Sequence, residues 1–455
     1  MIRKILVANR GEIAVRIIRA CREMGIETVA IYSEADKDAL HAKLADEAIC
    51  IGPAALSESY LSMERIISAT IISGAEAIHP GFGLLSENSR FAKLCEECNI
   101  IFIGPASDVI SRLGDKQAAR ETMIQAGIPV IPGGDHAIYD EADALKTAER
   151  TGYPVMIKAV LGGGGKGMRM AKDADELAKN FVIAQTEAKK SFGDGAMYIE
   201  RFIKRPRHIE FQILADRFGN VIHLGERDCS IQRNHQKMIE EAPSIALSHE
   251  LRAKMGEMAV RAAKAAGYVN AGTIEFLLEN DGHFYFMEMN TRIQVEHPIT
   301  EWVTGIDLIK EQIRIADGKK LSYTQEQVTI AGHAIEVRIN AERPKENFLP
   351  CPGTITGLHL PGGKGVRIDS AIYSGYTIPP YYDSMIAKIS VWAKNRKEAI
   401  RKMQSALGEV IIEGVDTNVN YQYALLNHPD FLAGKVDIEF IDRIQKQEME
   451  SDDAK

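Results

Sequence analysis

Two apolar segments joined by an Asp-Gly pair constrain the middle of this 455-residue chain more than any other feature. Residues 273–278 and 284–287 each have the composition of a buried strand, and Asp281-Gly282 between them favours a tight hairpin. A two-residue turn at this pair places Glu275 directly opposite Glu288, whereas a three-residue turn would shift the register and remove that pairing. Because like charges that face each other across a ladder are destabilising, the two-residue turn predicts a cation between the carboxylates.

Polar side chains continue past the second segment, in the stretch Glu288–Pro298. On a strand, Glu288, Asn290 and Arg292 would share one face, which would then carry an acid, an amide and a guanidinium. Oxygen ligands such as Glu275, Glu288 and Asn290 suit Mg²⁺, which proteins often hold through one or two carboxylates together with substrate phosphates. The sequence therefore predicts a magnesium-nucleotide site here, although for a lone Glu a strand end emerging into solvent would be the simpler interpretation.

Length, charge and cysteine content narrow the class of protein. The chain is too long for one hydrophobic core, so two or three domains are expected. The formal net charge of −8 argues against a dedicated nucleic-acid binder, and no apolar run is long enough to span a bilayer. Residues 1–7 lead at once into Asn9-Arg10-Gly11-Glu12 and are interpreted as a first strand, not as a signal peptide. Six sparse, irregularly spaced cysteines fit a reducing compartment, so a cytoplasmic location is expected.

The first hundred or so residues alternate strand-like and helix-like segments. The strand-like segments are residues 5–8, 28–32, 48–51, 77–78 and 100–103. This alternation predicts a parallel, Rossmann-like sheet. The Gly-x-Gly-x-x-Gly fingerprint is absent after the first strand, so a dinucleotide site is not expected. The stretch His79–Glu87 has two Gly and one Pro at a strand end, which favours a ligand-facing loop and a plain tight connection about equally.

A glycine-rich loop follows a strand that carries a lysine. Residues 153–159 form the predicted strand, with Lys158 near its end, and residues 162–169 contain four consecutive glycines, Lys166 and a fifth glycine. Backbone amides of such a loop can approach an anion closely. The GxxxxGK[ST] order is absent, so the loop is not a P-loop. Together with Lys158 and the facing acids, it is interpreted as a lid over phosphates, with a plain flexible connection as the alternative.

Two further strand-like segments carry polar residues. Residues 196–203 form a predicted strand that leads into a hinge, and such a segment could present backbone groups to an adenine edge. Residues 205–216 alternate polar and apolar side chains, which predicts a half-buried strand with His208 and Glu210 on one face.

Residues 226–237 are unusually dense in charge. A solvated loop is the usual explanation of such a run, but the run lacks Gly and flexible linker residues. His235 and Lys237 are two residues apart and could point together at an anion, so a functional segment is favoured.

Long, ordered strings of residues run through the whole chain. They are Ile5–Ala14, Lys116, Tyr153–Lys158, Gly162–Met168, Glu226–Ser230, Gln236-Lys237, Glu240–Pro243, Glu288–His297 and Pro379–Met385. In these strings the chain resembles biotin carboxylase, a member of the ATP-grasp superfamily. The resemblance implies an α/β fold with an N-terminal Rossmann-like parallel sheet, a central ATP-grasp domain with a mobile Gly-rich lid, and a C-terminal mixed α+β domain. The implied boundaries are 1–113, 114–330 with the lid at about 131–203, 331–446, and a charged tail at 447–455.

The same resemblance implies ATP-dependent carboxylation of protein-bound biotin by bicarbonate, through carboxyphosphate. Two Mg²⁺ or Mn²⁺ ions would be held by Glu275, Glu288 and Asn290, in agreement with the hairpin argument. The residues implied to bind ATP are Lys116, Lys158, Gly164, Gly165, Glu200, Arg201, Phe202, Ile203, His208, Gln232, His235, Glu275 and Glu288.

Bicarbonate is implied to lie among Lys237, Arg292, Gln294, Val295 and Glu296. Glu296 would be the general base that removes its proton before attack on the γ-phosphoryl group of ATP. The implied catalytic residues are completed by Arg338, whose cation would stabilise the biotin ureido oxygen while the ring nitrogen attacks CO₂.

One departure from the family concerns the biotin pocket. The family usually has Tyr where Phe82 stands, in the His-Pro-Gly-x-Gly loop, and Leu84 replaces an expected aromatic residue. The resemblance still assigns Phe82 to the biotin pocket with Arg338, so altered affinity with retained chemistry is expected.

Partners are inferred from what the sequence lacks. It has no Met-Lys-Met biotinylation motif and no carboxyltransferase region, so a biotin carboxyl carrier protein and separate carboxyltransferase subunits are the expected partners. A homodimer is expected, without nucleic-acid or membrane partners. The favoured role is the first half-reaction of acetyl-CoA carboxylase, which leads to malonyl-CoA and fatty acid synthesis. The alternatives are the same role in a pyruvate or other acyl-CoA carboxylase, another ATP-grasp ligase, and a non-catalytic ATP-sensing subunit, which would be expected to lack Glu296 or Lys237.

Overall fold

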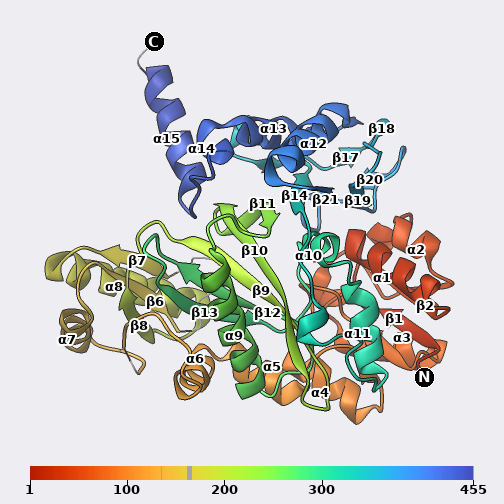
Figure 1. Ribbon diagram of the computed structural model, residues 1–455. Helices are drawn as coiled ribbons and strands as arrows, with labels where there is room; N and C mark the ends of the chain where they lie inside the picture. The colour runs from red at the N-terminus through yellow and green to blue at the C-terminus, as the bar shows by residue number, and fades with distance from the viewer. Residues whose placement is uncertain (135, 161–166, 454–455) are drawn as a thin grey trace.

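The N-terminal strands form a parallel sheet of order β3-β2-β1-β4-β5, so the predicted Rossmann-like arrangement is confirmed (Figure 1). The computed structural model describes residues 1–134, 136–160 and 167–453. On β1, Ile5 and Val7 pack with helix α1, whereas Leu6 packs with α3 and α4. Both faces are thus covered, which is why this strand is apolar throughout. The elements are β1 (Lys4–Val7), α1 (Gly11–Glu23), β2 (Glu27–Tyr32), α2 (Leu40–Leu44), β3 (Glu47–Cys50), α3 (Met63–Ser73), β4 (Ala77–His79), α4 (Ser89–Glu97), β5 (Ile101–Phe102) and α5 (Ser107–Gly114).

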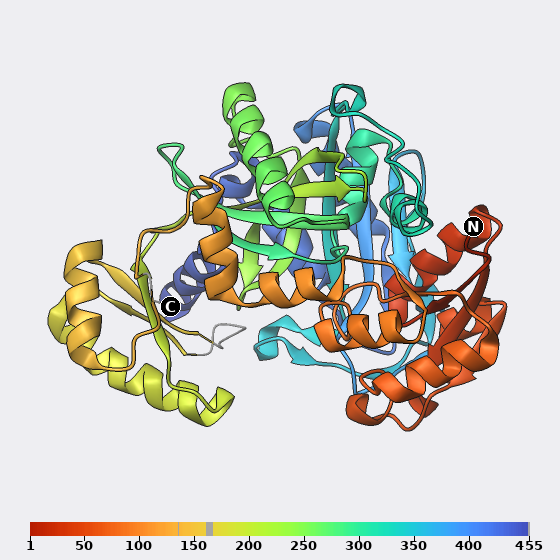
Figure 2. The same cartoon turned by 90° about the horizontal axis from the view of Figure 1, so that it is seen from below.

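A small lobe projects from one side of the molecule (Figure 2). It contains an antiparallel sheet of order β7-β6-β8, against which helices α7 and α8 bury their apolar faces. Each helix begins at an aspartate whose side chain accepts a hydrogen bond from the first turn, Asp140 for α7 and Asp173 for α8. The elements are α7 (Glu141–Thr151), β6 (Val155–Ala159), β7 (Met168–Ala171), α8 (Ala174–Phe192) and β8 (Met197–Arg201). The lobe occupies the region predicted as the lid, although residues 161–166 of the glycine-rich loop lie outside the described residues.

An antiparallel sheet of order β13-β12-β9-β10-β11-β14-β21-β19 forms the centre of the molecule. Its first part has an apolar face, covered by helices α6 and α9, and a polar face, over which α10 lies. Strand β11 pairs with β14, so the sheet continues across the predicted boundary at residue 330. The elements are α6 (Lys116–Gln125), β9 (Arg207–Ala215), β10 (Val221–Arg233), β11 (Gln236–Ala242), α9 (His249–Ala265), β12 (Asn270–Leu278), β13 (Phe284–Asn290), α10 (His297–Thr304), α11 (Leu308–Ala316), β14 (His333–Asn340), β19 (Val366–Ser370) and β21 (Met385–Ala393).

The C-terminal residues pack helices α12 and α13 against β14 and β21 and add three two-stranded ladders. These elements are β15 (Glu342–Arg343), β16 (Leu349–Pro350), β17 (Gly353–Thr354), β18 (Gly357–His359), β20 (Thr377–Ile378), α12 (Arg396–Glu409), β22 (Ile411–Glu413), α13 (Val419–Asn427), α14 (Pro429–Leu432) and α15 (Phe440–Asp453). The backbone of the predicted charged tail continues α15 as far as Asp453. Single 3-10 turns, η1 to η4, occur at Glu34–Asp36, Leu56–Glu58, Gln325–Gln327 and Pro344–Glu346. Within the described ranges, no helix is both long and apolar enough to cross a membrane.

Candidate active site

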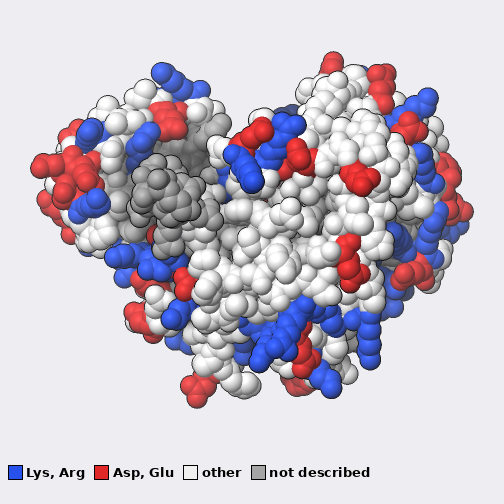
Figure 3. Space-filling model, turned by 90° about the horizontal axis from the view of Figure 1, so that it is seen from above, with Lys and Arg blue, Asp and Glu red and all other residues white. Residues whose placement is uncertain are grey.

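A cleft of about 990 Å³ lies between the small lobe and the polar face of the large sheet. Figure 3 shows the outline of the molecule hollowed between two lobes, with acidic and basic side chains interspersed around them. Almost all of the predicted site residues line this one cleft. They are Lys116, Lys158, Glu200, Arg201, Phe202, Ile203, His208, Gln232, His235, Lys237, Glu275, Glu288, Asn290, Arg292, Gln294, Val295, Glu296 and Arg338.

Two groups of predicted residues are exceptions. Gly164 and Gly165 lie outside the described residues. Phe82 is described, but it is not among the residues that line the cleft. Its ring packs with the core beneath the N-terminal sheet, and the ring centroid lies 6.0 Å from the ammonium of Lys388.

The turn between β12 and β13 differs from the predicted one. The amide of Glu279 donates to the carbonyl of His283 at 2.8 Å, so residues 280–282 form a three-residue turn. The predicted two-residue turn at Asp281-Gly282 is therefore wrong. A longer turn of this kind would by itself remove the pairing of Glu275 with Glu288.

The two carboxylates nevertheless face each other because of a bulge. Phe276 pairs with Phe286, whereas Glu275 pairs with Glu288, which leaves Met287 as an extra residue on β13. The bulge restores the register that the three-residue turn displaced. The predicted opposition of the acids is thus confirmed, for a reason that the sequence argument did not contain.

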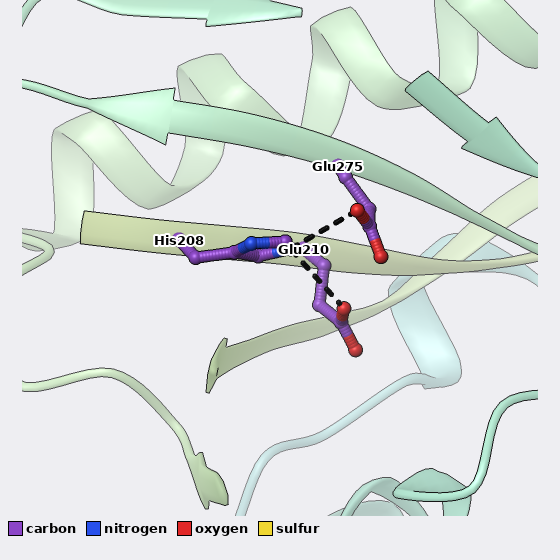
Figure 4. A group of neighbouring side chains, drawn as sticks. All are labelled: His208, Glu210 and Glu275. Atoms are coloured by element: carbon purple, nitrogen blue, oxygen red, sulfur yellow. Dashed lines mark ion pairs between the residues drawn. The ribbon is translucent and has the colours of Figure 1, made fainter. Parts of the chain in front are cut away.

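Lys237 lies among three carboxylates on the polar face of the sheet. Its Nζ is 2.5 Å from Glu210, 2.9 Å from Glu275 and 2.7 Å from Glu296. Burial alone would lower the pKa of Lys237, but these acids outweigh burial and hold the pKa well above its ordinary value. His208 Nε2 lies beside two of the same acids, 3.1 Å from Glu275 and 3.7 Å from Glu210 (Figure 4). Lys237 is therefore a fixed cation inside an acid-rich cluster.

The charge-dense run at 226–237 belongs to a β10–β11 hairpin, which excludes the solvated-loop interpretation. Asn234 and His235 form its turn, with φ angles of 49° and 62°. Arg227 is fully buried, and its Nε is 2.5 Å from Glu210. A second nitrogen of Arg227 donates to Gln294 Oε1 at 2.5 Å. Arg227 thus fixes an acid below Lys237 and orients one residue of the loop after β13.

That loop, residues 291–296, is held from two sides. Glu87, which follows β4 in the N-terminal region, accepts a hydrogen bond from Arg292 Nε at 2.9 Å. On the sheet side, Gln294 Nε2 donates to Glu275 at 2.9 Å. The loop is therefore held between the N-terminal region and the large sheet by its own side chains.

Glu296 ends this loop and touches two cations. One of its oxygens is 2.7 Å from Lys237 and the other is 3.1 Å from Arg338. Burial alone would raise the pKa of Glu296, but Lys237 and Arg338 outweigh burial and hold the pKa well below its ordinary value. Arg338 is shared, because its guanidinium is also 2.6 Å from Glu240. Burial raises the pKa of Glu240 to about 7 despite this contact.

The other wall of the cleft comes from β6, β8 and α6. Lys158 Nζ is 2.5 Å from Glu200 across the β6–β8 pair. Lys116, at the start of α6, faces the same space, and its enclosure there lowers its pKa. Two lysines thus face the cleft from this wall.

Two backbone amides of the hinge after β8 donate hydrogen bonds within the protein. The amide of Arg201 donates to the Pro132 carbonyl at 2.7 Å, and the amide of Phe202 donates to the Pro154 carbonyl at 2.9 Å. Ile203, the next residue along the chain, lines the cleft.

The donors around Glu275 and Glu288 fit a divalent cation. Burial alone would raise the pKa of Glu275, but Lys237 and His208 hold it well below its ordinary value, so this acid is ionised. Glu288 is open to the cleft, and its enclosure there together with repulsion from Glu275 raises its pKa to about 7. A cation between the two would remove that repulsion. Asn290 is less available as a ligand for this cation, since its Oδ1 accepts a hydrogen bond from Arg292 at 2.9 Å.

Several residues of the site were missed by sequence reasoning. Glu87 and Arg227 belong to segments that the sequence singled out, but nothing local indicates their partners. Glu240 lies in a quoted string without an assigned role. Lys388 had a local signal, because a lysine between apolar residues of a strand is rarely buried without a partner.

Comparison with known families covers nearly the whole chain. Residues 1–110 match the model described as "Biotin carboxylase, N-terminal domain". Residues 115–324 match "Carbamoyl-phosphate synthase L chain, ATP binding domain", and residues 336–443 match "Biotin carboxylase C-terminal domain".

Individual relatives agree with this result. Biotin carboxylase 1 of Bacillus subtilis is 57% identical over 97% of this chain and 98% of its own. A pyruvate carboxylase subunit from Methanothermobacter thermautotrophicus is 55% identical over 98% of this chain and 91% of its own. The solved biotin carboxylase domain dimer of the Hydrogenobacter thermophilus 2-oxoglutarate carboxylase, in complex with MgADP, ADP and bicarbonate, is similar with a TM-score of 0.92 and 50% identity, over 97% of this chain and 98% of that one. With these matches along its full length and an ATP-grasp cleft at its centre, the chain belongs to the biotin carboxylase family of ATP-dependent ligases.

Proposed function

We propose that this chain uses MgATP and bicarbonate to carboxylate biotin presented on a carrier protein. The observation that carries the proposal is the position of Glu296 between Lys237 and Arg338, in the cleft that also holds the Glu275–Glu288 pair. An acid, two cations and a cation-binding pair in one enclosed site suit the activation of a small oxyanion by a nucleotide.

Bicarbonate binds beside Lys237 and Arg292, with Gln294 and the amide of Val295 as further contacts. Lys237 keeps the pKa of Glu296 low. An anion that draws Lys237 toward itself weakens this contact and makes Glu296 a stronger base. Glu296 then removes the bicarbonate proton, and a bicarbonate oxygen attacks the γ-phosphoryl group of ATP, so that carboxyphosphate forms and ADP leaves. Carboxyphosphate breaks down to CO₂ and phosphate within the enclosed cleft.

Arg338 acts in the second step. Phosphate released from carboxyphosphate takes the proton of the biotin ureido nitrogen, and the guanidinium of Arg338 stabilises the resulting negative charge on the ureido oxygen while the nitrogen attacks CO₂. Because Arg338 is shared between Glu240 and Glu296, biotin has to replace part of one of these contacts. Phe82 lies outside the lining of the cleft, so we assign it an indirect effect on biotin affinity through its packing.

The nucleotide occupies the wall formed by the small lobe. Lys116 and Lys158 neutralise its phosphates, the hinge at residues 200–203 faces adenine with the Ile203 amide as donor, and His208, Gln232 and His235 lie along it. Gly164 and Gly165 are assigned to the lid over the phosphates on sequence grounds. Glu275, Glu288 and Asn290 would hold Mg²⁺ or Mn²⁺, whose positive charge would offset that of the phosphates.

Phosphate release from MgATP, measured with and without bicarbonate and free biotin, tests this proposal. The expected result is ATP cleavage that requires bicarbonate. Glu296→Gln should abolish carboxylation while nucleotide binding persists, whereas Glu409→Gln, at an exposed position of α12, is the matched control. ATP cleavage that ignores bicarbonate would reject the proposal. Loss of nucleotide binding in Glu296→Gln would make Glu296 a metal or structural residue.

We further propose that the enzyme performs the first half-reaction of acetyl-CoA carboxylase, with a separate carrier protein and separate carboxyltransferase subunits. Support comes from the relative named biotin carboxylase at 57% identity, whereas the relative at 55% is named as part of a pyruvate carboxylase. The catalytic residues do not separate the two roles. Isolation of the carrier protein that co-purifies with this chain, followed by carboxylation of acetyl-CoA or pyruvate with its carboxyltransferase, distinguishes them.

The last part of the proposal concerns the domain boundaries, the oligomeric state and the location of the enzyme. We propose domains at 1–113, 114–330, 331–446 with the tail at 447–455, a homodimer as in the Hydrogenobacter thermophilus domain, and a cytoplasmic location. The six cysteines are free thiols, which fits a reducing compartment.

A further inference from the structure

Lys388 on β21 is a fully buried lysine that the reaction described above does not use. It lies directly opposite Arg338 on β14 and directly opposite Asp369 on β19. Helix α10 packs against β21, and α1 packs against β19 and β21 (Figure 1). The ammonium of Lys388 donates a hydrogen bond to the carbonyl oxygen of Val295.

The same ammonium connects that carbonyl to the N-terminal region. Its Nζ lies 3.2 Å from Glu12 Oε1, at the start of α1, and Glu12 is only 5% exposed. Burial alone would lower the pKa of Lys388, but Glu12, Glu336 and Asp369 outweigh burial and raise the pKa, so the ammonium is charged. A charged lysine is expensive to bury, and a buried one marks a place where its hydrogen bonds are needed.

The hydrogen bond from Lys388 meets the loop one residue before the proposed base, Glu296. The Val295 carbonyl belongs to the peptide unit that ends in the amide of Glu296, so its direction fixes the backbone just before the proposed base. Other parts of the loop are held by Glu87 and Arg227, which contact Arg292 and Gln294. Lys388 fixes the loop at Val295 through its hydrogen bond to the carbonyl oxygen.

We propose that Lys388 is a positioning residue for bicarbonate, which aims the Val295–Glu296 backbone at the anion while Glu12 balances its charge. This inference rests on the proposed function of the 292–296 loop. It predicts that loss of the lysine weakens bicarbonate binding specifically, because Lys388 contacts the loop at Val295, whereas Lys116, Lys158 and the hinge at residues 200–203 lie on the other wall of the cleft.

Three variants separate positioning from plain stability. Lys388→Met keeps the length of the side chain but leaves Glu12 as a buried, unpaired acid, which lowers the melting temperature. Glu12→Gln/Lys388→Met removes both charges and should recover much of that loss. Lys402→Met is the matched control, since Lys402 also donates to two carbonyls, of Lys364 and Trp392, but far from the loop.

Bicarbonate-dependent ATP cleavage and thermal unfolding are measured for each. Lys388→Met and the double variant should both raise the KM for bicarbonate by about tenfold or more, the usual weight of a charged hydrogen bond, with little change in the KM for ATP. Recovery of the bicarbonate KM together with the melting temperature in the double variant would overturn the inference, as would equal changes in both KM values. If the parent protein shows no bicarbonate dependence, the proposed function fails first. If the parent shows it and the variants keep the parent KM, the role of Lys388 alone fails.

Discussion

Glu275 on β12 lies directly opposite Glu288 on β13, and Lys237 contacts only the first of them among the ion pairs of the described residues. This asymmetry gives the two acids different states. The charge of Glu275 is compensated by Lys237 and His208, so this acid is ionised. Glu288 has a raised pKa and is open to the cleft. Glu288 is therefore the acid that gains most from a bound cation.

Glu288→Gln should separate the charge repulsion from cation binding. Without metal and at pH 8, the variant should be slightly more stable than the parent, by less than about 1 kcal/mol, because Glu275 no longer faces a like charge. The increase in melting temperature that Mg²⁺ gives the parent should be lost. A variant that keeps the Mg²⁺ effect would show that the cation does not bind at this pair.

Replacement of Arg227 should be strongly destabilising. Arg227→Met leaves Glu210 buried and partly uncompensated, which should cost about 3–5 kcal/mol in the free energy of unfolding. Denaturant titration measures this loss. Arg261→Met is the control, since Arg261 pairs with Glu257 on the surface of α9 and should cost less than about 1 kcal/mol. Equal, small losses in the two variants would contradict the structural role of Arg227.

Glu240 should make the stability of the protein fall as pH rises. Its pKa is raised from 4.5 to about 7, so the folded state holds its proton more tightly than the unfolded state. The stabilising contribution is therefore complete below pH 4.5 and is lost as pH rises through 7. Relative to Glu240→Gln, the parent should lose roughly 3 kcal/mol across this window.

The neighbouring acid provides the control for this pH effect. Contacts with His333 and Arg396 outweigh burial and lower the pKa of Glu241 to about 2. Its contribution is present above pH 4.5 and is lost only as pH falls through 2. Glu241 itself should thus stay ionised between pH 5 and 8. A stability difference between the parent and Glu240→Gln that is constant across this window would contradict the pKa assigned to Glu240.

The sequence predicted the strands of the site better than their connections. The alternation of polar and apolar residues located His208 and Glu210 on one face of β9, because that pattern depends only on local backbone geometry. The prediction of the β12–β13 turn was wrong because Asp-Gly occurs in two-residue and in three-residue turns. The bulge at Met287 has no signal in the local sequence.

Other features were beyond sequence reasoning because their causes are long-range. The 226–237 run contains no Gly, so the positive φ angles of Asn234 and His235 gave no recognisable turn. Its charges are buried because partners come from β9 and α9, where Glu210 binds Arg227 and Arg252 binds Glu226. The burial of Lys388 likewise depends on partners distant in the chain, Glu12 and the Val295 carbonyl.

The central claim, that an oxygen of bicarbonate attacks ATP in the cleft of Lys237, Arg292 and Glu296, has one direct measurement. ATP is cleaved in the presence of bicarbonate labelled with oxygen-18, and the released phosphate is examined by mass spectrometry. The proposed route forms a bond between a bicarbonate oxygen and the γ-phosphorus, and that oxygen remains with phosphate when carboxyphosphate releases CO₂. Phosphate that carries one labelled oxygen is the predicted result. Unlabelled phosphate from labelled bicarbonate would mean that water attacks ATP, and would contradict the account.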